Sequence, residues 1–344
     1  MQPGMSYMYL TFFRYDKGAT MKKTVAVRSY PRLHLGLLDL SGAYMRVDGG
    51  FGISVSAFPL TATVSESVST QIVGQSADIR KLCQHVLDDM KEILPHTCVK
   101  IAVESEGALH WGLGFATQCV FSVAQALLLF FQLDISKDEL ALILHRGGTS
   151  GIGIHSFYHG GFLVDGGHAF PKDKNTLGPT SQCTPTVIPP LIARLPFPNW
   201  LICIAVPNVQ RLLGGMDEVE FWHQVTPIPI DEGRLLCHNL LMGILPSVAL
   251  KNFSDFCSAI QISTIAGMKK REIAYWQPGF TQCSDILRKN GWHGITLSSL
   301  GPAIIGFAEN SEIVMVKKSA MESSGLFSSI VITTARNSGF EILF

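Results

Sequence analysis

The sequence predicts an α+β fold in two units. At 344 residues the chain is longer than the roughly 250–300 residues at which a single hydrophobic core stops growing. Runs of β-branched residues alternate with runs of helical apolar spacing, and hydrophobic residues make up 47% of the chain. A polar, proline-rich stretch without periodicity, residues 171–190, marks a boundary. We therefore expect domains at 21–180 and 181–344, preceded by an N-terminal extension at 1–20.

The first unit is expected to open with an antiparallel sheet that helices then cover. Short β-branched runs predict strands at 24–27, 51–58, 61–66, 99–104 and 161–165. Apolar spacing predicts helices at 76–94, closed by Pro95, at 116–133 and at 136–145. At the start of the last helix, Ser136 and Glu139 have the spacing of a capping box.

The second unit mixes the same two patterns. We expect strands at 200–206, 303–308, 313–316 and 330–334, and helices at 231–245, 253–266, 279–289 and 318–324. A mixture of this kind is typical of an α+β domain.

Composition excludes several classes of function. Lys plus Arg and Asp plus Glu number 27 each, so no overall charge draws the protein to nucleic acid or to an anionic membrane. The most apolar run, 126–131, is too short to cross a bilayer. No two of the eight cysteines have the spacing of a metal or redox pair, and we interpret them as the reduced thiols of a cytoplasmic protein. Residues 1–20 lack the pattern of an export signal, and Met21 is a second candidate start.

The strongest local motif is a glycine-containing loop at 110–118, with the sequence His-Trp-Gly-Leu-Gly-Phe-Ala-Thr-Gln. Gly112 and Gly114 let the backbone approach an anion closely, and the helix that follows presents unpaired amide hydrogens and a positive dipole end. Phosphate is the ligand that suits this arrangement. The alternative is a tight strand-to-helix turn, which is the commoner explanation of a glycine pair alone.

Two further small-residue stretches strengthen the phosphate interpretation. Residues 146–153, Arg-Gly-Gly-Thr-Ser-Gly-Ile-Gly, add a cation in Arg146 that could bind ligand oxygens in a bidentate manner. Residues 298–302, Ser-Ser-Leu-Gly-Pro, place hydroxyls at a turn. Each stretch alone is more often a simple turn, but together with 110–118 they favour a site for a polyphosphate.

Polar residues near the start could join this site. Arg32 and His34 alternate with apolar residues and so share one face of a strand, and residues 46–50, with Asp48, follow at an expected turn. A single histidine on a half-buried strand is commonly just hydrogen-bonded in the core, so a functional role for His34 requires the loops to lie nearby.

Two other candidates concern metal binding. Asp165 follows an expected strand, where a carboxylate either caps a turn or binds Mg²⁺ beside a pyrophosphate. His155 and His159 stand four apart and could share a helical face, but no third ligand has matching spacing, and a structural role is favoured.

The three loops resemble those of the GHMP superfamily of small-molecule kinases, which includes galactokinase, homoserine kinase and mevalonate kinase. More specifically, the chain resembles the β-ribofuranosylaminobenzene 5'-phosphate synthase family between about residues 22 and 308. The resemblance implies a GHMP-kinase-like fold, with an N-terminal ribosomal-protein-S5-like α/β domain and a C-terminal ferredoxin-like α+β domain. The motifs that carry it are 32–36, Gly49-Gly50, 112–114 with Thr117-Gln118, 150–153, 160–162, and Ser298-Ser299 with Gly301-Pro302.

The resemblance also implies an activity. That family is a group of Mg²⁺-dependent glycosyltransferases that join phosphoribosyl pyrophosphate to 4-aminobenzoate or a similar aromatic acid, release pyrophosphate and CO₂, and leave a C-riboside. An ATP-dependent GHMP-type kinase is the alternative. Many such kinases carry an aspartate where this chain has Gly153, and a glycine cannot act as a base. A ligand-binding protein that has lost catalysis is the third interpretation. The oligomeric state, a homodimer included, is left open.

Roles for individual residues follow from the resemblance. The catalytic residues would be Arg32, His34 and Asp39, and Asp165 would bind the metal. The substrate-binding residues would be Asp48, Gly112, Gly114, Thr117, Gln118, Arg146, Ser150, Gly151, Ser298 and Ser299, with Gln277 lining the pocket from the second domain. The chain departs from the family's Gly-Arg-Gly-x-Arg loop, since His145 replaces the first glycine and Thr149 the second arginine, which removes an expected anion contact.

Overall fold

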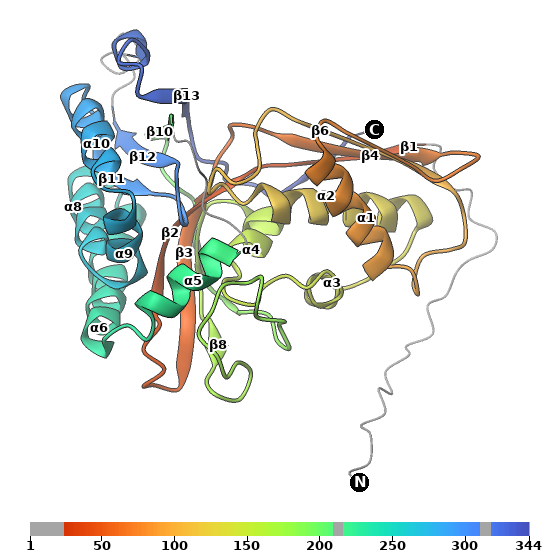
Figure 1. Ribbon diagram of the computed structural model, residues 1–344, viewed down its shortest axis with the longest axis horizontal. Helices are drawn as coiled ribbons and strands as arrows, with labels where there is room; N and C mark the ends of the chain where they lie inside the picture. Colours follow the sequence, from red (N-terminus) through yellow and green to blue (C-terminus); the bar gives the residue numbers. More distant parts are fainter. Residues whose placement is uncertain (1–23, 209–215, 310–317, 344) are drawn as a thin grey trace.

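The computed structural model describes residues 24–208, 216–309 and 318–343. Their strands form three sheets, and helices pack against the faces of these sheets (Figure 1). The mixture of helices with mainly antiparallel strands confirms the predicted α+β class. Among the described residues, no helix combines the length and the apolar character needed to cross a membrane.

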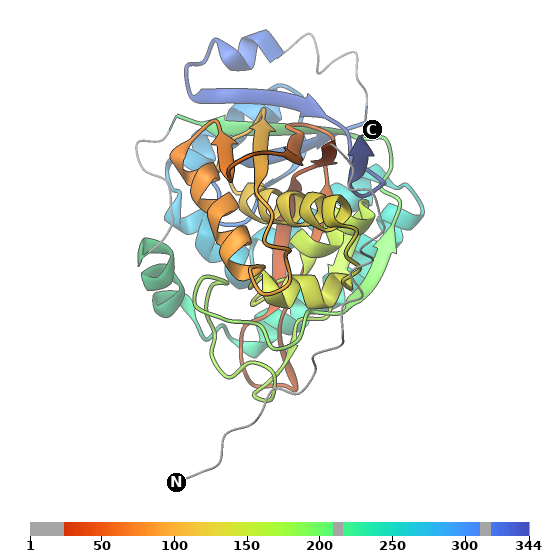
Figure 2. The same cartoon turned by 90° about the vertical axis from the view of Figure 1, so that its right-hand side faces the viewer.

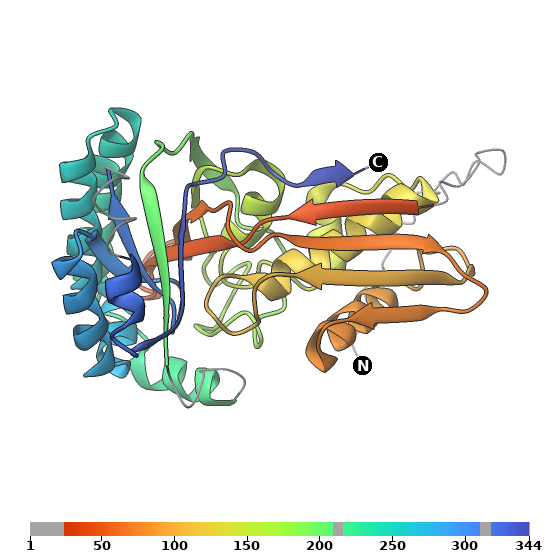
Figure 3. The same cartoon turned by 90° about the horizontal axis from the view of Figure 1, so that it is seen from above.

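The first sheet carries the helix that will shape the site. Its strand order is β14-β1-β4-β6-β5. The strands are β1 (Thr24–Ser29), β4 (Leu60–Glu66), β5 (Gln71–Gly74), β6 (Val99–Ser105) and β14 (Glu341–Leu343). Helices α1 (Ala77–Asp89) and α2 (Phe115–Phe131) cover one face (Figure 2). Strand β14 pairs antiparallel with β1, so the described end of the chain lies at the edge of this sheet (Figure 3).

The middle sheet has the order β2-β3-β7-β9, with β8 paired to β3. Its strands are β2 (Arg32–Asp39), β3 (Arg46–Ser54), β7 (Phe162–Asp165), β8 (His168–Ala169) and β9 (Leu191–Leu195). The short helices α3 (Lys137–Ile143) and α4 (Ile152–His159) lie in the connection from α2 to β7. Because β9 pairs with β7, this sheet takes strands from both sides of residue 180.

The third sheet, ordered β11-β12-β10-β13, is covered by a layer of helices at one end of the molecule (Figure 1). The strands are β10 (Leu201–Pro207), β11 (His293–Leu297), β12 (Ile304–Ala308) and β13 (Phe327–Thr333). The helices of this layer are α6 (Ile230–Asn239), α8 (Phe253–Thr264), α9 (Gly267–Tyr275) and α10 (Gly279–Lys289), and α5 (Met216–Val225) lies outside it. A π-helical segment, Leu240–Ile244, and α7 (Leu245–Ala249) continue α6 directly.

A continuous apolar core joins the middle and third sheets. The ring of Phe197 lies 6.4 Å from that of Phe162 on β7 and 5.3 Å from that of Phe256 on α8. Phe256 in turn meets Phe307 on β12 at 5.0 Å, edge to face. Edge-to-face aromatic pairs add stabilisation beyond the area they bury. The loops between the middle and third sheets are therefore anchored to one apolar core.

Most of the predicted elements are present, with shifted ends. The expected N-cap at Ser136 is confirmed, since its hydroxyl accepts a hydrogen bond from the Glu139 amide at 3.2 Å. The Ser76 hydroxyl caps α1 in the same way, accepting from the Ile79 amide at 3.2 Å. Residues 318–322 are helical, as expected. The expected strand at 313–316 lies outside the described residues.

Other expectations are corrected by the structure. The turn expected at 46–50 is wrong, because these residues belong to β3 and pair with β2, with Asp48 opposite Asp39. Asp48 and Gly49 do have positive φ, 66° and 63°, so the turn-like conformation occurs inside a strand. Two helices, α5 and α9, were not expected. In α9 the buried Lys269 and Glu272 replace apolar residues and hide the helical spacing.

Candidate active site

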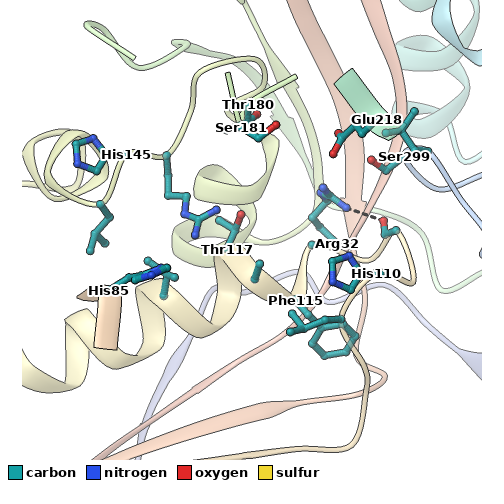
Figure 4. Close-up of a pocket in the computed structure, with 18 of the residues that line it drawn as sticks. Arg32, His85, His110, Phe115, Thr117, His145, Thr180, Ser181, Glu218 and Ser299 are labelled. Atoms are coloured by element: carbon teal, nitrogen blue, oxygen red, sulfur yellow. Dashed lines mark hydrogen bonds between the residues drawn. The ribbon is translucent and has the colours of Figure 1, made fainter. Parts of the chain in front are cut away.

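The start of β2 holds two of the loops together. The Arg32 amide donates to the carbonyl oxygen of Leu113 at 3.0 Å, and the Arg32 guanidinium donates from Nη1 to the carbonyl oxygen of Gly112 at 2.8 Å (Figure 4). The Ser298 hydroxyl donates to the same Gly112 oxygen at 2.8 Å, and the Ser299 amide donates to the carbonyl oxygen of His34 at 2.9 Å. The 110–118 loop, β2 and the 298–302 loop therefore meet at one place.

The other glycine stretch lies against the same helix. The Gln118 side chain on α2 donates from Nε2 to the carbonyl oxygen of Gly153 at 3.0 Å. A Cβ atom at Gly153 would stand 3.1 Å from the Thr117 methyl carbon, so the start of α4 packs closely on the start of α2. All three small-residue stretches thus converge, as the polyphosphate interpretation requires.

Glycine is necessary at the centre of the 110–118 loop. Gly112 has φ 79°, a left-handed conformation that L side chains rarely adopt. A Cβ atom there would lie 2.3 Å from the carbonyl oxygen of Ser298. Gly114, with φ 74°, caps α2 and would place a Cβ atom 3.0 Å from the guanidinium carbon of Arg32. Both positions need a residue without a side chain.

Two connected cavities open between these loops. The larger has a volume of about 600 Å³ and extends from the 110–118 loop toward α1. The smaller has a volume of about 120 Å³ and lies between β2, the start of α4 and α5. The residues that line both cavities, and so mark their junction, are Arg32, Thr117, Arg146, Thr180, Glu218, Ser299 and Leu300.

The N-terminus of α2 faces the larger cavity. Gly114, Phe115, Ala116 and Thr117 all line it, and no side chain caps this helix end. The first amide hydrogens of a helix have no partner within the helix, and the helix dipole makes this end positive. This wall of the cavity is therefore suited to an anion.

Two arginines add full positive charge at the junction of the cavities. Within the part of the chain that the structure describes, neither Arg32 nor Arg146 forms an ion pair, and each has an enclosed Nε without a hydrogen-bond partner. Burial lowers the pKa of Arg32 to about 10 and also lowers that of Arg146, yet both remain cationic at neutral pH. Buried cations without carboxylate partners are costly unless an anion joins them.

Acidic and basic side chains reach the site from helices α5 and α9. Lys269 is buried, donates to the carbonyl oxygen of Ser299 at 2.9 Å and pairs with Glu272. Glu218 on α5 lines both cavities and makes no ion pair or hydrogen bond within the described ranges. Burial and the nearby Glu272 raise the pKa of Glu218. Glu218 is therefore a carboxylate available to a cation or to a ligand hydroxyl.

A chain of three polar residues borders the smaller cavity. The His34 ring nitrogen Nε2 lies 3.2 Å from the Ser150 hydroxyl, which donates to Asp165 Oδ2 at 2.9 Å. Asp165 also accepts from the amides of Gly151 and Gly167, each at 2.9 Å. Burial raises the pKa of Asp165 to about 6, against the lowering effect of these hydrogen bonds. Burial, with Arg32 and Lys269 nearby, holds the pKa of His34 well below its usual value.

Comparison with characterised proteins decides the family. The chain is 31% identical to the β-ribofuranosylphenol 5'-phosphate synthase of Methanocaldococcus jannaschii over 329 residues, which cover 92% of this chain and 99% of that protein. A protein of the same name from Archaeoglobus fulgidus is also 31% identical, over 92% of this chain and 98% of its own length. The chain belongs to the β-ribofuranosylphenol 5'-phosphate synthase family. It is an enzyme of ribosyltransferase type, and the family expected from the motifs is confirmed.

Solved structures place the synthase family in the GHMP fold. Homoserine kinase from Cytophaga hutchinsonii superimposes with a TM-score of 0.64 at 14% identity, covering 94% of this chain and 99% of its own. Mevalonate diphosphate decarboxylase from Staphylococcus aureus gives a TM-score of 0.62 at 12% identity, covering 94% and 98%. At these identities the likeness shows the fold alone. No protein-family profile matches the chain.

The site of this synthase contains some of the expected residues directly. Of these, Arg32, Gly112, Gly114, Thr117, Arg146 and Ser299 line the larger cavity, and His34 and Ser150 line the smaller. Others support the site from behind: Gln118, Gly151, Asp165 and Ser298 line neither cavity and instead hold the loops by the hydrogen bonds described above. Their expected roles in binding stay predictions.

Asp39 and Asp48 lie away from the cavities of the synthase. Asp39 accepts hydrogen bonds from the amide and hydroxyl of Ser41 at 2.7 and 2.6 Å. Asp48, 1% exposed, accepts from Lys174 Nζ at 3.0 and 2.9 Å and lies 2.7 Å from His168 Nδ1. His168 Nε2 donates to the carbonyl oxygen of Gly147 at 2.9 Å. Through His168, Asp48 thus fixes the start of the 146–153 loop at Gly147.

One expectation at the edge of the site needs correction. Gln277 does not line a pocket: it is exposed and accepts a hydrogen bond from Thr281. Its neighbour Trp276 is the residue that reaches the site's edge, donating from Nε1 to the carbonyl oxygen of Leu300 at 2.7 Å. His155 has a structural contact, as favoured, since its Nε2 donates to the carbonyl oxygen of Pro189 at 2.8 Å.

Several site residues were not expected from the sequence. Glu218 and Trp222 come from α5, and Lys269 and Glu272 from α9, the two helices that the apolar spacing did not indicate. The one available signal was the placement of Lys269 and Glu272 three apart, the spacing of an ion pair on a helix. Their burial depends on tertiary packing and has no local signature.

Proposed function

We propose that this chain transfers the 5-phosphoribosyl group of phosphoribosyl pyrophosphate to a ring carbon of an aromatic carboxylic acid, with loss of pyrophosphate and CO₂. The observation that carries the proposal is the anion cradle at the junction of the cavities. There Arg32 and Arg146 have no carboxylate partner among residues 24–208, 216–309 and 318–343, and they lie beside the N-terminus of α2. A doubly phosphorylated sugar carries the negative charges that would pair with these two arginines and the positive helix end.

The larger cavity suits such a ligand. Its volume of about 600 Å³ lies within the range of small-molecule sites. We assign the pyrophosphate to the amides of the 110–118 loop and the first turn of α2, with Arg146 beside it, and the remaining phosphate or carboxylate to Arg32. Donors fixed before the reaction stabilise a leaving group as its charge develops.

Magnesium belongs to the proposal as the partner of the pyrophosphate. Mg²⁺ is commonly held by one or two carboxylates together with substrate phosphates, and the described residues contain no cluster of three or more metal-binding side chains. The unpaired Glu218 in the cavity fits the role of a single carboxylate ligand. Asp165, the ligand expected from the sequence, is fully buried and bonded to three donors. Bound Mg²⁺ would neutralise charge on the departing pyrophosphate.

The names of the relatives support a choice of ring acceptor. Those proteins are named for a β-ribofuranosylphenol 5'-phosphate, and the proposed exchange of a carboxyl group for the sugar would give such a phenol from a hydroxybenzoate. We therefore propose 4-hydroxybenzoate, or 4-aminobenzoate as in the sequence-based expectation, as the acid. In either ring the para substituent donates electrons to the carbon that carries the carboxylate.

The local chemistry favours this reaction over phosphoryl transfer. Gly153 lines the smaller cavity where many superfamily kinases have a catalytic aspartate, and a Cβ atom there would already stand 3.1 Å from the Thr117 methyl carbon. A kinase needs a group that handles the proton of an accepting hydroxyl. A carbon nucleophile that loses CO₂ has no such requirement at this position.

The test is a direct assay with Mg²⁺. The protein is incubated with phosphoribosyl pyrophosphate and carboxyl-labelled 4-hydroxybenzoate or 4-aminobenzoate, and pyrophosphate and labelled CO₂ are measured. We expect both products in equal amounts. A parallel incubation with ATP and a panel of sugars and alcohols should yield no ADP. ADP formation there would indicate the kinase, and binding of phosphoribosyl pyrophosphate without any turnover would indicate a binding protein.

A further inference from the structure

We propose that the smaller cavity binds the aromatic ring of the acceptor, and that His34, oriented by Ser150 and Asp165, accepts the hydrogen of the ring's para substituent. This inference rests on the proposed function, which it extends by assigning a subsite and a proton acceptor. Ser150 and Asp165 act through His34 and are positioning residues.

The smaller cavity has the size of a site for one ring, and part of its wall is apolar. Its volume is about 120 Å³, and an apolar cavity of about 150 Å³ in another protein holds benzene. Its apolar wall consists of Leu37, Ile154, Pro179, Trp222 and Leu300. Small-molecule sites are commonly apolar surfaces with a few polar groups that fix the ligand's orientation.

The positions of the polar groups determine the orientation of the ring. Arg32 and Arg146 line both cavities and therefore lie at their junction, where the phosphoribosyl group would be. His34 and Ser150 line the smaller cavity only. The carboxylate, and the carbon that carries it, thus belong at the junction beside the arginines. The para substituent, at the opposite end of the ring, then faces His34.

The hydrogen-bond chain fixes which nitrogen of His34 carries the hydrogen. Asp165 as a carboxylate can only accept, so the single hydrogen of the Ser150 hydroxyl is directed to Asp165. The Ser150 oxygen then accepts from His34 Nε2 and from the Ile152 amide, both at 3.2 Å. His34 Nδ1 is left as an acceptor, and it has no hydrogen-bond partner within the part of the chain described.

The charges around His34 keep its ring neutral and able to accept. Arg32 from the same strand and Lys269 from α9 face it, and burial adds to their effect in lowering its pKa. Of the carboxylates on the neighbouring helices, Glu272 is engaged by Lys269, and Glu218 lines the cavity. Asp165 reaches His34 only through Ser150.

The proposed step balances. The ring carbon that bears the carboxylate forms a bond to the anomeric carbon, and the bond from that carbon to the pyrophosphate oxygen breaks, with its electron pair leaving on pyrophosphate. The para hydroxyl gives its proton to Nδ1 as the ring becomes a dienone. The bond to the carboxylate then breaks and releases CO₂. Its electron pair restores the aromatic ring, and the proton returns from Nδ1 to the oxygen.

The first test measures binding, which does not require turnover. Calorimetric titrations compare 4-hydroxybenzoate with benzoate, which lacks the para hydroxyl. One hydrogen bond is expected to give the wild-type protein a preference of about 10-fold for 4-hydroxybenzoate. His34→Leu should abolish the preference, Ser150→Ala should reduce it, and Ser181→Ala, in the larger cavity only, should leave it unchanged. A preference retained in His34→Leu would overturn the inference.

The second test uses the reaction. With saturating phosphoribosyl pyrophosphate, His34→Leu should lower kcat for 4-hydroxybenzoate by about 100-fold or more, in line with the contribution of a positioned acid–base group. Ser150→Ala should lower kcat about 10-fold and leave the KM for phosphoribosyl pyrophosphate unchanged. If the wild-type enzyme releases pyrophosphate but neither variant differs from it, this inference fails and the proposed function stands. If the wild-type enzyme releases none with any acid, the proposed function fails.

Discussion

The guanidinium of Arg32 holds the carbonyl oxygen of Gly112 at 2.8 Å and has no carboxylate partner among the described residues. One of its edges therefore fixes the glycine loop, while its positive charge remains free for a ligand at the junction of the cavities. The same residue shapes the site and would bind the substrate. An arginine suits both tasks, because its planar fork of donors can serve a backbone carbonyl and an anion at once.

Replacing Arg32 with lysine tests this double role. Lysine keeps the charge and loses the fork, so Arg32→Lys should weaken binding of phosphoribosyl pyrophosphate about 10- to 100-fold, measured by calorimetry. The matched control is Arg28→Lys on the neighbouring strand, where the guanidinium donates to Thr61 and lines neither cavity. Equal affinity in Arg32→Lys and Arg28→Lys would contradict a direct role for Arg32.

The glycine loop gives a second prediction. Gly112→Ala would place a methyl group 2.3 Å from the carbonyl oxygen of Ser298 at a φ of 79°, so the 110–118 and 298–302 loops must separate. We expect a loss of about 2–3 kcal/mol in the free energy of unfolding, together with loss of ligand binding. Gly279→Ala is the control, since a Cβ there meets nothing within 4 Å. Urea denaturation of both variants checks the difference.

The glycine loops could be predicted from the sequence because their chemistry is local. A backbone position that needs a positive φ and has no room for a side chain requires glycine, so glycines mark such loops in the sequence. The expected approach of 110–118 to 146–153 occurs through the hydrogen bond between Gln118 and Gly153. The position of Asp48 could not be predicted from local sequence alone. A turn was expected there, but register with β2 places Asp48, with its positive φ, inside a strand. Pairing between distant segments decides that outcome.

The acidic side of the site could not be predicted for a related reason. Glu218, Lys269 and Glu272 belong to helices whose apolar spacing is interrupted by these same charged residues. Burial of a charge is stable only with partners, and the partners here, such as the carbonyl oxygen of Ser299, come from other parts of the chain. A local pattern contains no information on that pairing.

The buried ion pair between Asp48 and Lys174, which contacts the 146–153 loop at Thr149, supports a third prediction. Asp48→Asn leaves Lys174, whose side chain is 6% exposed, without its counter-ion. Removal of one partner from a buried pair costs about 3–5 kcal/mol of the free energy of unfolding. The double variant Asp48→Asn with Lys174→Met removes the unpaired charge and should recover much of that loss. A double variant no more stable than Asp48→Asn, by urea denaturation, would contradict this account.

The pH dependence of stability has a contribution from His155. Burial lowers the pKa of His155 to about 4 in the native state, against 6.5 for an unperturbed histidine. Between these values the unfolded chain binds a proton that the native protein does not, so stability falls as the pH drops from 6.5 to 4 and is fully present above 6.5. The shift corresponds to about 3 kcal/mol. His155→Gln, which keeps a donor for Pro189, should lose this part of the pH dependence in urea denaturation at pH 7, 5.5 and 4.

A substitution of Glu218 tests whether this carboxylate binds the metal or only adds negative charge to the cavity wall. Its carboxylate lines both cavities and has no partner among the residues that the structure describes. Burial together with Glu272 raises its pKa, so the charged form is costly until a cation joins it. Glu218→Gln removes the charge at nearly constant shape. If Glu218 holds Mg²⁺ beside the pyrophosphate, this variant should bind phosphoribosyl pyrophosphate about 10-fold or more weakly with Mg²⁺, and with little dependence on Mg²⁺ concentration.

Glu220→Gln, an exposed position on the same helix, is the control and should behave as wild type. If Glu218→Gln instead binds the ligand more tightly and keeps the Mg²⁺ dependence, the carboxylate only repels the substrate's phosphates, and the metal ligand must be another group.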